Sequence, residues 1–122
     1  MNNIPKLVAS DIGGTLIDGS QIIPGFTAKV LNELVQNSIP VVLITGYNYR
    51  TTMKYTVNLN EKIILMPQNG SMCIRKRKDV REYWLPDKDV RSIFNFLDNK
   101  NLPIVIYKGK EDNYKNYYMG QK

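Results

Sequence analysis

The sequence contains no histidine, and Cys73 is its single cysteine. Without histidine, neither a Ser-His-Asp nor a Cys-His nucleophile can form, and a His-ligated zinc site is excluded as well. One cysteine cannot form an internal disulfide or a thiolate zinc cluster, so we expect a reducing, cytoplasmic environment. Apolar runs are short, and none approaches the ~18 residues of a membrane helix. The sequence therefore predicts a protein without a membrane span.

The composition is that of a folded domain. Of the 122 residues, 43% are hydrophobic and 23% are charged. This apolar fraction is enough for a packed core, which argues against a disordered or low-complexity chain. Because domains run to roughly 100–200 residues, the length allows one domain at most.

Positive charge is concentrated in the second half of the sequence. The net charge is +6, of which residues 71–122 contribute +5. The densest basic run is Arg75–Lys78, close to Tyr83 and Trp84. A basic run beside aromatic residues suits nucleic acid, but it equally suits the solvated tip of a hairpin or attraction of a small anionic substrate. A nucleic-acid-binding module is therefore kept as the lesser alternative.

Strand and helix patterns alternate through the first half of the chain. Short apolar runs predict strands at 6–10, 40–44 and 63–66, and helical spacing predicts helices at 24–37 and 47–59. In the first helix the spaced apolar residues are Phe26, Val30, Leu31, Leu34 and Val35, and in the second they are Met53 and Val57. Short connections between such elements predict a βαβαβ unit with parallel strands.

The alternation ends at residue 70. Two strands are expected at 71–77 and 80–85, joined by a turn at Lys78-Asp79. Asp87 has the character of an N-cap for an amphipathic helix that carries Val90, Ile93, Phe94 and Leu97. A further strand is expected at 104–107.

Three polar motifs follow the three predicted parallel strands. They are residues 11–15 (Asp-Ile-Gly-Gly-Thr), the pair Thr45-Gly46, and residues 68–70 (Gln-Asn-Gly). In open parallel sheets, ligands bind at the carboxyl ends of the strands. These motifs therefore predict a binding site at one edge of the sheet.

Asp11 has two interpretations. A carboxylate leaving an apolar strand is poorly solvated unless a cation or backbone N–H groups meet it. It can then be a nucleophile and magnesium ligand, with the following glycines turning N–H groups toward a phosphate. It can also cap its own turn. Spacing alone does not decide between the two, but Thr45-Gly46 favours phosphate, because a hydroxyl and a free N–H suit one phosphate oxygen.

The motifs also resemble a known family. Residues 6–16 resemble the first motif of the haloacid dehalogenase (HAD) superfamily of phosphohydrolases, and residues 41–46 resemble its second motif. Residues 68–71 look like the entry to the large cap of the Cof-type branch. The resemblance covers nearly the whole chain in sequential order. It implies an α/β fold, with the HAD-like three-layer α/β/α core and its partial parallel sheet beginning in residues 1–70 and an α+β cap beginning in residues 71–122.

The resemblance assigns roles to individual residues. Asp11 would attack phosphorus and form an aspartyl-phosphate, and Mg²⁺ would be held by Asp11 and the backbone carbonyl of Gly13. Thr45 would bind a phosphoryl oxygen, and the N–H groups of Ile12, Gly13 and Gly14 would complete the clamp. Gly46 and Asn69 complete the set of expected phosphate-binding residues. The implied substrates are small phosphorylated metabolites such as sugar phosphates.

Two departures from the family pattern weaken the expected activity. Gly13 stands where the phosphatases carry a second Asp, the general acid, which is typically worth ~10²–10⁴ in rate. The later Lys and the acidic pair that binds magnesium are not found before the chain ends inside the expected cap, so we expect weak Mg²⁺ binding. In addition, Tyr47 follows Thr45-Gly46 where relatives often carry Arg.

These departures keep a second function open, a non-catalytic phosphate-binding or protein-interaction module that retains the fold. They also predict an exposed apolar edge at residues 7–9, because strands that flank this one in the family sheet are not found in the sequence. Natural proteins usually cover such an edge. We therefore expect self-association into a homo-oligomer, or a companion chain at this edge.

Overall fold

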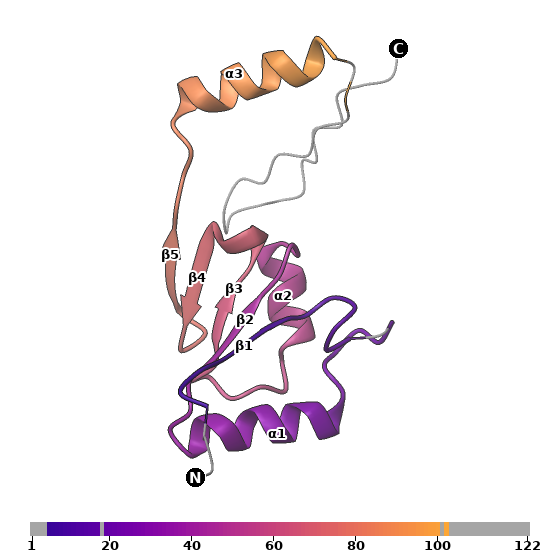
Figure 1. The fold of residues 1–122 in the computed structure, drawn as a ribbon, viewed down its shortest axis with the longest axis vertical. Coiled ribbons are helices and arrows are strands. Elements are labelled where there is room, and N and C mark those ends of the chain that lie inside the picture. The colour runs from indigo at the N-terminus through magenta and orange to yellow at the C-terminus, as the bar shows by residue number, and fades with distance from the viewer. Residues whose placement is uncertain (1–4, 18, 101, 103–122) are drawn as a thin grey trace. The chain divides into compact units, whose positions relative to one another are not determined.

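The computed structural model describes residues 5–17, 19–100 and 102 (Figure 1). The α-helices of this part are α1 (Gly25–Gln36), α2 (Tyr49–Tyr55) and α3 (Asp87–Asp98). The strands are β1 (Val8–Asp11), β2 (Val41–Ile44), β3 (Ile64–Met66), β4 (Met72–Arg75) and β5 (Asp79–Glu82), and a 3-10 turn, η1 (Gln68–Gly70), follows β3. The strand expected at 104–107 lies outside the described residues.

The strands form one mixed sheet in the order β1-β2-β3-β4-β5 (Figure 1). β1, β2 and β3 are parallel, with Asp11 paired with Ile44 and Ile44 paired with Met66. β4 and β5 continue the same sheet in the antiparallel direction. The α/β fold and the parallel βαβαβ beginning are confirmed, and β1 forms one edge of the described sheet.

The hydrophobic core lies on one face of this sheet. Alternate residues of β2, Val41 and Leu43, are buried together with Leu65 of β3 and Ile74 of β4. Helix α1 closes the cluster, and side chains of α2 pack against it. The alternate positions on the other face, such as Ile44, are half-buried or exposed. The described residues thus supply two layers of the predicted three.

Helix α1 buries a different stripe from the predicted one. Ala28, Leu31 and Val35 are buried, whereas Phe26 is 81% exposed and Val30 is 40% exposed. Each residue turns the helix by about 100°, so positions 26 and 30 lie opposite positions 28, 31 and 35. The apolar spacing identified the helix correctly, but its face was partly wrong because a small residue, Ala28, occupies the core side.

Helix α2 is shorter than predicted. It begins after Asn48, whose side-chain oxygen accepts a hydrogen bond of 2.8 Å from the Thr51 N–H. It ends at Tyr55, so Val57 lies beyond the helix and is 65% exposed. Met53 packs against the core as expected.

The β4–β5 turn lies earlier in the chain than predicted. Lys76 and Arg77 have positive φ values of 47° and 57°, and the Lys78 N–H donates to the Arg75 carbonyl at 3.2 Å. The expected turn at Lys78-Asp79 is therefore wrong. Turns with positive φ match the twist of hairpin strands, and non-glycine residues adopt them where other contacts compensate.

The chain divides into two compact units, Met1–Glu82 and Tyr83–Lys122. The domain boundary at 70/71 remains a prediction. In the second unit, Pro86 occupies the N-cap of α3 and Asp87 is its first residue, so the Asp87 N-cap is wrong. Asp87 and Asp89 in the first turn still favour the helix, because negative charge stabilises a helix N-terminus. Among the described helices, none has the length and apolar character needed to cross a bilayer.

Candidate functional site

A hollow of about 340 Å³ lies at the carboxyl ends of β1 and β2, next to η1. Its lining residues are Ala9, Ser10, Asp11, Ile44, Thr45, Gly46 and Asn69. Four predicted site residues, Asp11, Thr45, Gly46 and Asn69, are thus brought together as the three parallel strands predicted. The other three, Ile12, Gly13 and Gly14, do not line the hollow.

Backbone hydrogen bonds tie the strand ends to one another. The Thr45 N–H donates to the Met66 carbonyl at 3.0 Å, and the Asn69 N–H donates to the Thr45 carbonyl at 2.9 Å. Asn69 has the left-handed φ of 56°. These contacts fix the polar residues after β2 and β3 relative to one another, and the pairing of Asp11 with Ile44 places the end of β1 beside them. The site is thus built by the sheet itself.

Asp11 is exposed at the end of β1. The poor solvation expected for its carboxylate is therefore wrong: along β1, Val8 and Ser10 are half-buried, whereas Ala9 and Asp11 alternate with them and are exposed. An exposed carboxylate needs no buried partner. It is open to a ligand that enters the hollow.

The glycine turn after Asp11 closes on itself. The N–H groups of Thr15, Leu16 and Ile17 converge on the Ile12 carbonyl, and the Gly14 N–H donates to the Ile17 carbonyl at 3.0 Å. The side chain of Ile12 is fully buried in the core. Among the described residues, the hydrogen bonds of this turn leave the Gly13 carbonyl unused. The Gly14 N–H is engaged within the loop.

Thr45 is the most enclosed polar side chain of the hollow, with 3% exposure. Its Oγ1 accepts a hydrogen bond of 3.2 Å from the Tyr47 N–H, which leaves the hydroxyl hydrogen free to point elsewhere. At Gly46, an added Cβ would lie 3.3 Å from Asn69 Oδ1. The glycine therefore lets the Asn69 amide lie close to the backbone after Thr45.

Two polar residues of this region were missed by sequence analysis. Ser10 lines the hollow, and its hydroxyl donates to the Asp11 carbonyl at 2.8 Å. Tyr47 reaches across to the glycine turn, where its Oη lies 2.7 Å from the position of a Cβ on Gly13. Ser10 was detectable from its place beside Asp11. The Tyr47 contact has no signal in the sequence, because it joins two loops through packing.

The described residues offer few metal ligands at the site. Asp11 is the only ionisable residue among them that lines the hollow. No group of three or more His, Cys, Asp or Glu side chains that could hold a metal occurs among the residues the structure describes. Mg²⁺ usually keeps several waters and uses one or two carboxylates plus substrate phosphate. The Asp11 carboxylate fits such a site. The Gly13 carbonyl lies outside the lining of the hollow, and no backbone hydrogen bond among the described residues engages it.

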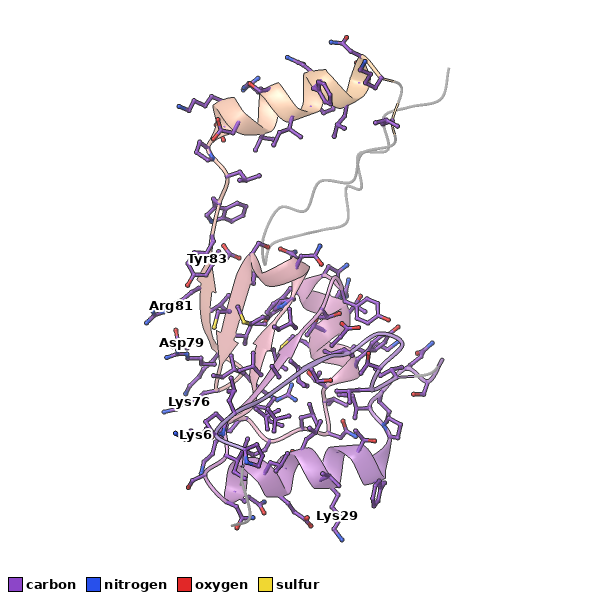
Figure 2. The ribbon with its side chains drawn as sticks, in the orientation of Figure 1. Lys6, Lys29, Lys76, Asp79, Arg81 and Tyr83 are labelled. Atoms are coloured by element: carbon purple, nitrogen blue, oxygen red, sulfur yellow. The ribbon has the colours of Figure 1, made fainter. Side chains whose placement is uncertain are left out.

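The basic run is partly used within the fold. The Arg77 guanidinium donates to the Thr56 carbonyl and, at 3.3 Å, to the Leu59 carbonyl. Burial lowers the pKa of Arg77 from its ordinary value. By contrast, Lys76 and Arg81 project outward from the hairpin, with Asp79 between them (Figure 2). Because Arg77 is held by backbone carbonyl groups, fewer cations of the basic run are available to an external ligand than the sequence suggests.

The sequence matches the model of a protein family described as haloacid dehalogenase-like hydrolase, over residues 8–121. A presumed phosphatase of Buchnera aphidicola subsp. Baizongia pistaciae is 32% identical over 65 residues, which are 53% of this chain and 24% of that protein. A second one, from Buchnera aphidicola subsp. Schizaphis graminum, is 29% identical over 66 residues, 54% of this chain and 24% of its own. The matched part thus spans about a quarter of these relatives' length.

Solved structures agree in fold. A haloacid dehalogenase-like hydrolase from B. subtilis superimposes with a TM-score of 0.67 at 23% identity, covering 80% of this chain and 34% of that one. A sugar phosphatase of HAD subclass IIB superimposes with a TM-score of 0.61 at 19% identity, covering 87% of this chain and 42% of that one. With the family model matching nearly its entire length, the chain belongs to the haloacid dehalogenase-like hydrolases.

Proposed function

We propose that the protein acts on small phosphate esters, such as sugar phosphates, through an aspartyl-phosphate at Asp11. The observation that carries this proposal is the hollow in which Asp11, Thr45 and Asn69 meet at the ends of the parallel strands. A nucleophilic carboxylate beside hydroxyl and amide donors suits phosphoryl transfer, whose catalysis is mainly positioning and charge stabilisation. The sugar phosphatase among the structural neighbours supports the substrate class.

Each lining residue has a role in this proposal. The exposed Asp11 carboxylate attacks phosphorus, and the Thr45 hydroxyl donates to a phosphoryl oxygen. The Gly46 backbone and the Asn69 amide bind from the side of β2 and η1. On the side of β1, the backbone N–H groups of Ile12 and Gly13 remain for the clamp, since the Gly14 N–H donates to the Ile17 carbonyl.

Asp11 and the Gly13 carbonyl would hold Mg²⁺, with phosphate and water completing its shell. A bound Mg²⁺ supplies charge neutralisation at the phosphoryl oxygens. Because the described residues offer few ligands for Mg²⁺, we propose weak metal binding and slow turnover. The missing carboxylate at Gly13 adds to the slow rate.

The test is hydrolysis of p-nitrophenyl phosphate by the 122-residue chain at millimolar MgCl₂. We expect slow release of p-nitrophenol that falls to background when EDTA removes the metal and returns when MgCl₂ is added back. The control is the same titration with CaCl₂, because Ca²⁺ prefers a larger, more flexible oxygen shell and should not restore the rate. A rate that EDTA leaves unchanged would contradict a metal-dependent mechanism.

A non-catalytic phosphate-binding module is the second candidate. It is favoured by the lining of the hollow, in which the described residues include one ionisable side chain and no second carboxylate for proton transfer. This candidate predicts saturable binding of a sugar phosphate in calorimetry without release of orthophosphate. Release of orthophosphate that depends on Asp11 would exclude it.

The single cysteine, which lies in β4, supports the cytoplasmic location that we propose for either function.

The β1 edge is proposed to pair with a second copy of the chain. Within the described sheet, β1 pairs only with β2, and the adjacent Leu7 is 54% exposed. Unpaired strand edges promote association, and lysine near an edge opposes it. We expect size-exclusion chromatography with light scattering to give the mass of a dimer or larger species, and Leu7→Lys to shift it toward a monomer.

A matched control is Val57→Lys, which places the same charge on an exposed apolar residue after α2. It should leave the mass unchanged. A native chain that elutes as a stable monomer, or equal effects of the two lysine variants, would argue against pairing through β1.

A further inference from the structure

Tyr47 places a phenol directly over the glycine turn that follows the proposed nucleophile. An added Cβ on Gly13 would lie 2.7 Å from Tyr47 Oη and 3.0 Å from Tyr47 Cζ. Gly13 is two residues after Asp11, and Tyr47 comes directly after Gly46, which lines the hollow. Neither Tyr47 nor Gly13 lines the hollow, but the phenol oxygen lies at the turn that directly follows Asp11.

Tyr47 is held in place through both its backbone and its ring. The backbone N–H donates to Thr45 Oγ1 at 3.2 Å, and the backbone carbonyl accepts from the Gln68 N–H at 2.9 Å. The ring meets Tyr55 edge to face, with centroids 5.3 Å apart and planes at 84°, and it packs against the core. Such aromatic contacts fix ring orientation. The position of Oη is therefore a consequence of packing and differs from that of a freely rotating surface phenol.

Among the residues that the structure describes, the lining of the hollow offers no other ionisable group to move a proton. It contains one ionisable side chain, Asp11, which a nucleophilic role occupies. The sequence has no histidine. Phosphoryl transfer from an alcohol ester leaves an alkoxide that needs a proton, and tyrosine is among the side chains that act as general acids. Tyr47 is the residue whose placement beside the glycine turn answers this need.

We propose that Tyr47 donates the proton to the leaving oxygen, a role that rests on the proposed phosphoryl transfer to Asp11. An Asp11 carboxylate oxygen forms a bond to phosphorus while the bond between phosphorus and the ester oxygen breaks. The departing ester oxygen takes the proton from Tyr47 Oη. Water then attacks the phosphorus of the aspartyl-phosphate and gives a proton to the Tyr47 phenolate. The Asp11–phosphorus bond breaks, which releases orthophosphate and restores both side chains.

This role predicts a dependence on the leaving group. An alkyl phosphate expels a strongly basic alkoxide, whereas p-nitrophenolate leaves without a proton. Removing the phenol hydroxyl should therefore slow the hydrolysis of an alkyl phosphate far more than that of p-nitrophenyl phosphate. A merely structural role of Tyr47 would slow both esters equally.

The experiment compares Tyr47→Phe with Tyr55→Phe, because both keep the edge-to-face ring pair and each removes one hydroxyl. Rates are measured for glycerol phosphate and p-nitrophenyl phosphate with the 122-residue chain. We expect Tyr47→Phe to lose about 10²-fold in kcat on glycerol phosphate and at most about threefold on p-nitrophenyl phosphate. Tyr55→Phe should keep both rates, and thermal unfolding checks that each variant is folded.

The outcomes separate this inference from the proposed function. Equal losses on the two esters, or no loss with Tyr47→Phe, would remove Tyr47 from proton transfer while phosphatase activity stands. A native chain that hydrolyses neither ester would contradict the proposed function, and the proton transfer would fall with it. A selective loss on glycerol phosphate is the result that the inference requires.

Discussion

Asp11→Asn is expected to reduce Mg²⁺-dependent hydrolysis of p-nitrophenyl phosphate by about 10³-fold or more, since removal of a nucleophile typically costs this much or more. The amide is a poor nucleophile and a weaker metal ligand than the carboxylate, so one substitution removes both proposed roles. Because Asp11 is exposed at the end of β1, the variant should fold normally. Steady-state rates with a thermal unfolding curve for each protein give the measurement.

The matched control is Asp79→Asn, which removes the same charge from an exposed carboxylate at the start of β5, away from the hollow. It should retain the native rate. The proposed intermediate adds a second readout, because an acid-quenched reaction should contain phosphorylated native protein and none in Asp11→Asn. Equal rates for the native chain and Asp11→Asn would show that another group carries any hydrolysis observed.

Gly13→Ala is expected to lower the free energy of unfolding by about 1–3 kcal/mol, which is the range for overpacking a well-filled site. The added Cβ would lie 2.7 Å from Tyr47 Oη, closer than non-bonded atoms approach. Tyr47 cannot easily retreat, because its ring is packed on Tyr55 and its backbone is bonded to Thr45 and Gln68. Urea unfolding of the native chain and the variant measures the difference.

Two further variants test the cause of this destabilisation. Gly25→Ala adds a Cβ that meets nothing within 4 Å at the start of α1, so it should be neutral or stabilise by up to about 1 kcal/mol. Tyr47→Ala removes the ring, so adding Gly13→Ala to it should cost much less than in the native chain. A double-mutant cycle reports this coupling. Additive effects would mean that Tyr47 does not set the cost at Gly13.

The contact between Gly13 and Tyr47 joins two departures from the family pattern into one physical feature. A carboxylate at position 13 requires a Cβ, and that Cβ overlaps the Tyr47 phenol. Restoring the expected acid at residue 13 therefore requires a smaller residue at position 47 as well. For this reason we expect Gly13→Asp alone to lose stability before it gains any activity.

The sequence predicted most of the sheet and the place of the site. Three apolar runs, each followed by a polar motif, are the parallel strands β1, β2 and β3, and their ends bring together Asp11, Thr45 and Asn69. The prediction succeeded because a buried parallel strand needs a continuous apolar run, and because the carboxyl ends of parallel strands lie at the same edge of the sheet. The prediction failed in details that depend on neighbours, such as the exposure of Phe26.

What the sequence determined by itself is the parallel α/β beginning, the family, and a carboxylate at the strand end without histidine. Only the tertiary structure decided that Arg77 binds the carbonyls after α2 and that Tyr47 covers Gly13. Local patterns fix strands and turns because neighbouring residues share one backbone geometry. Contacts between separate loops follow from how side chains fill the space between elements, and the linear order does not encode that packing in any short motif.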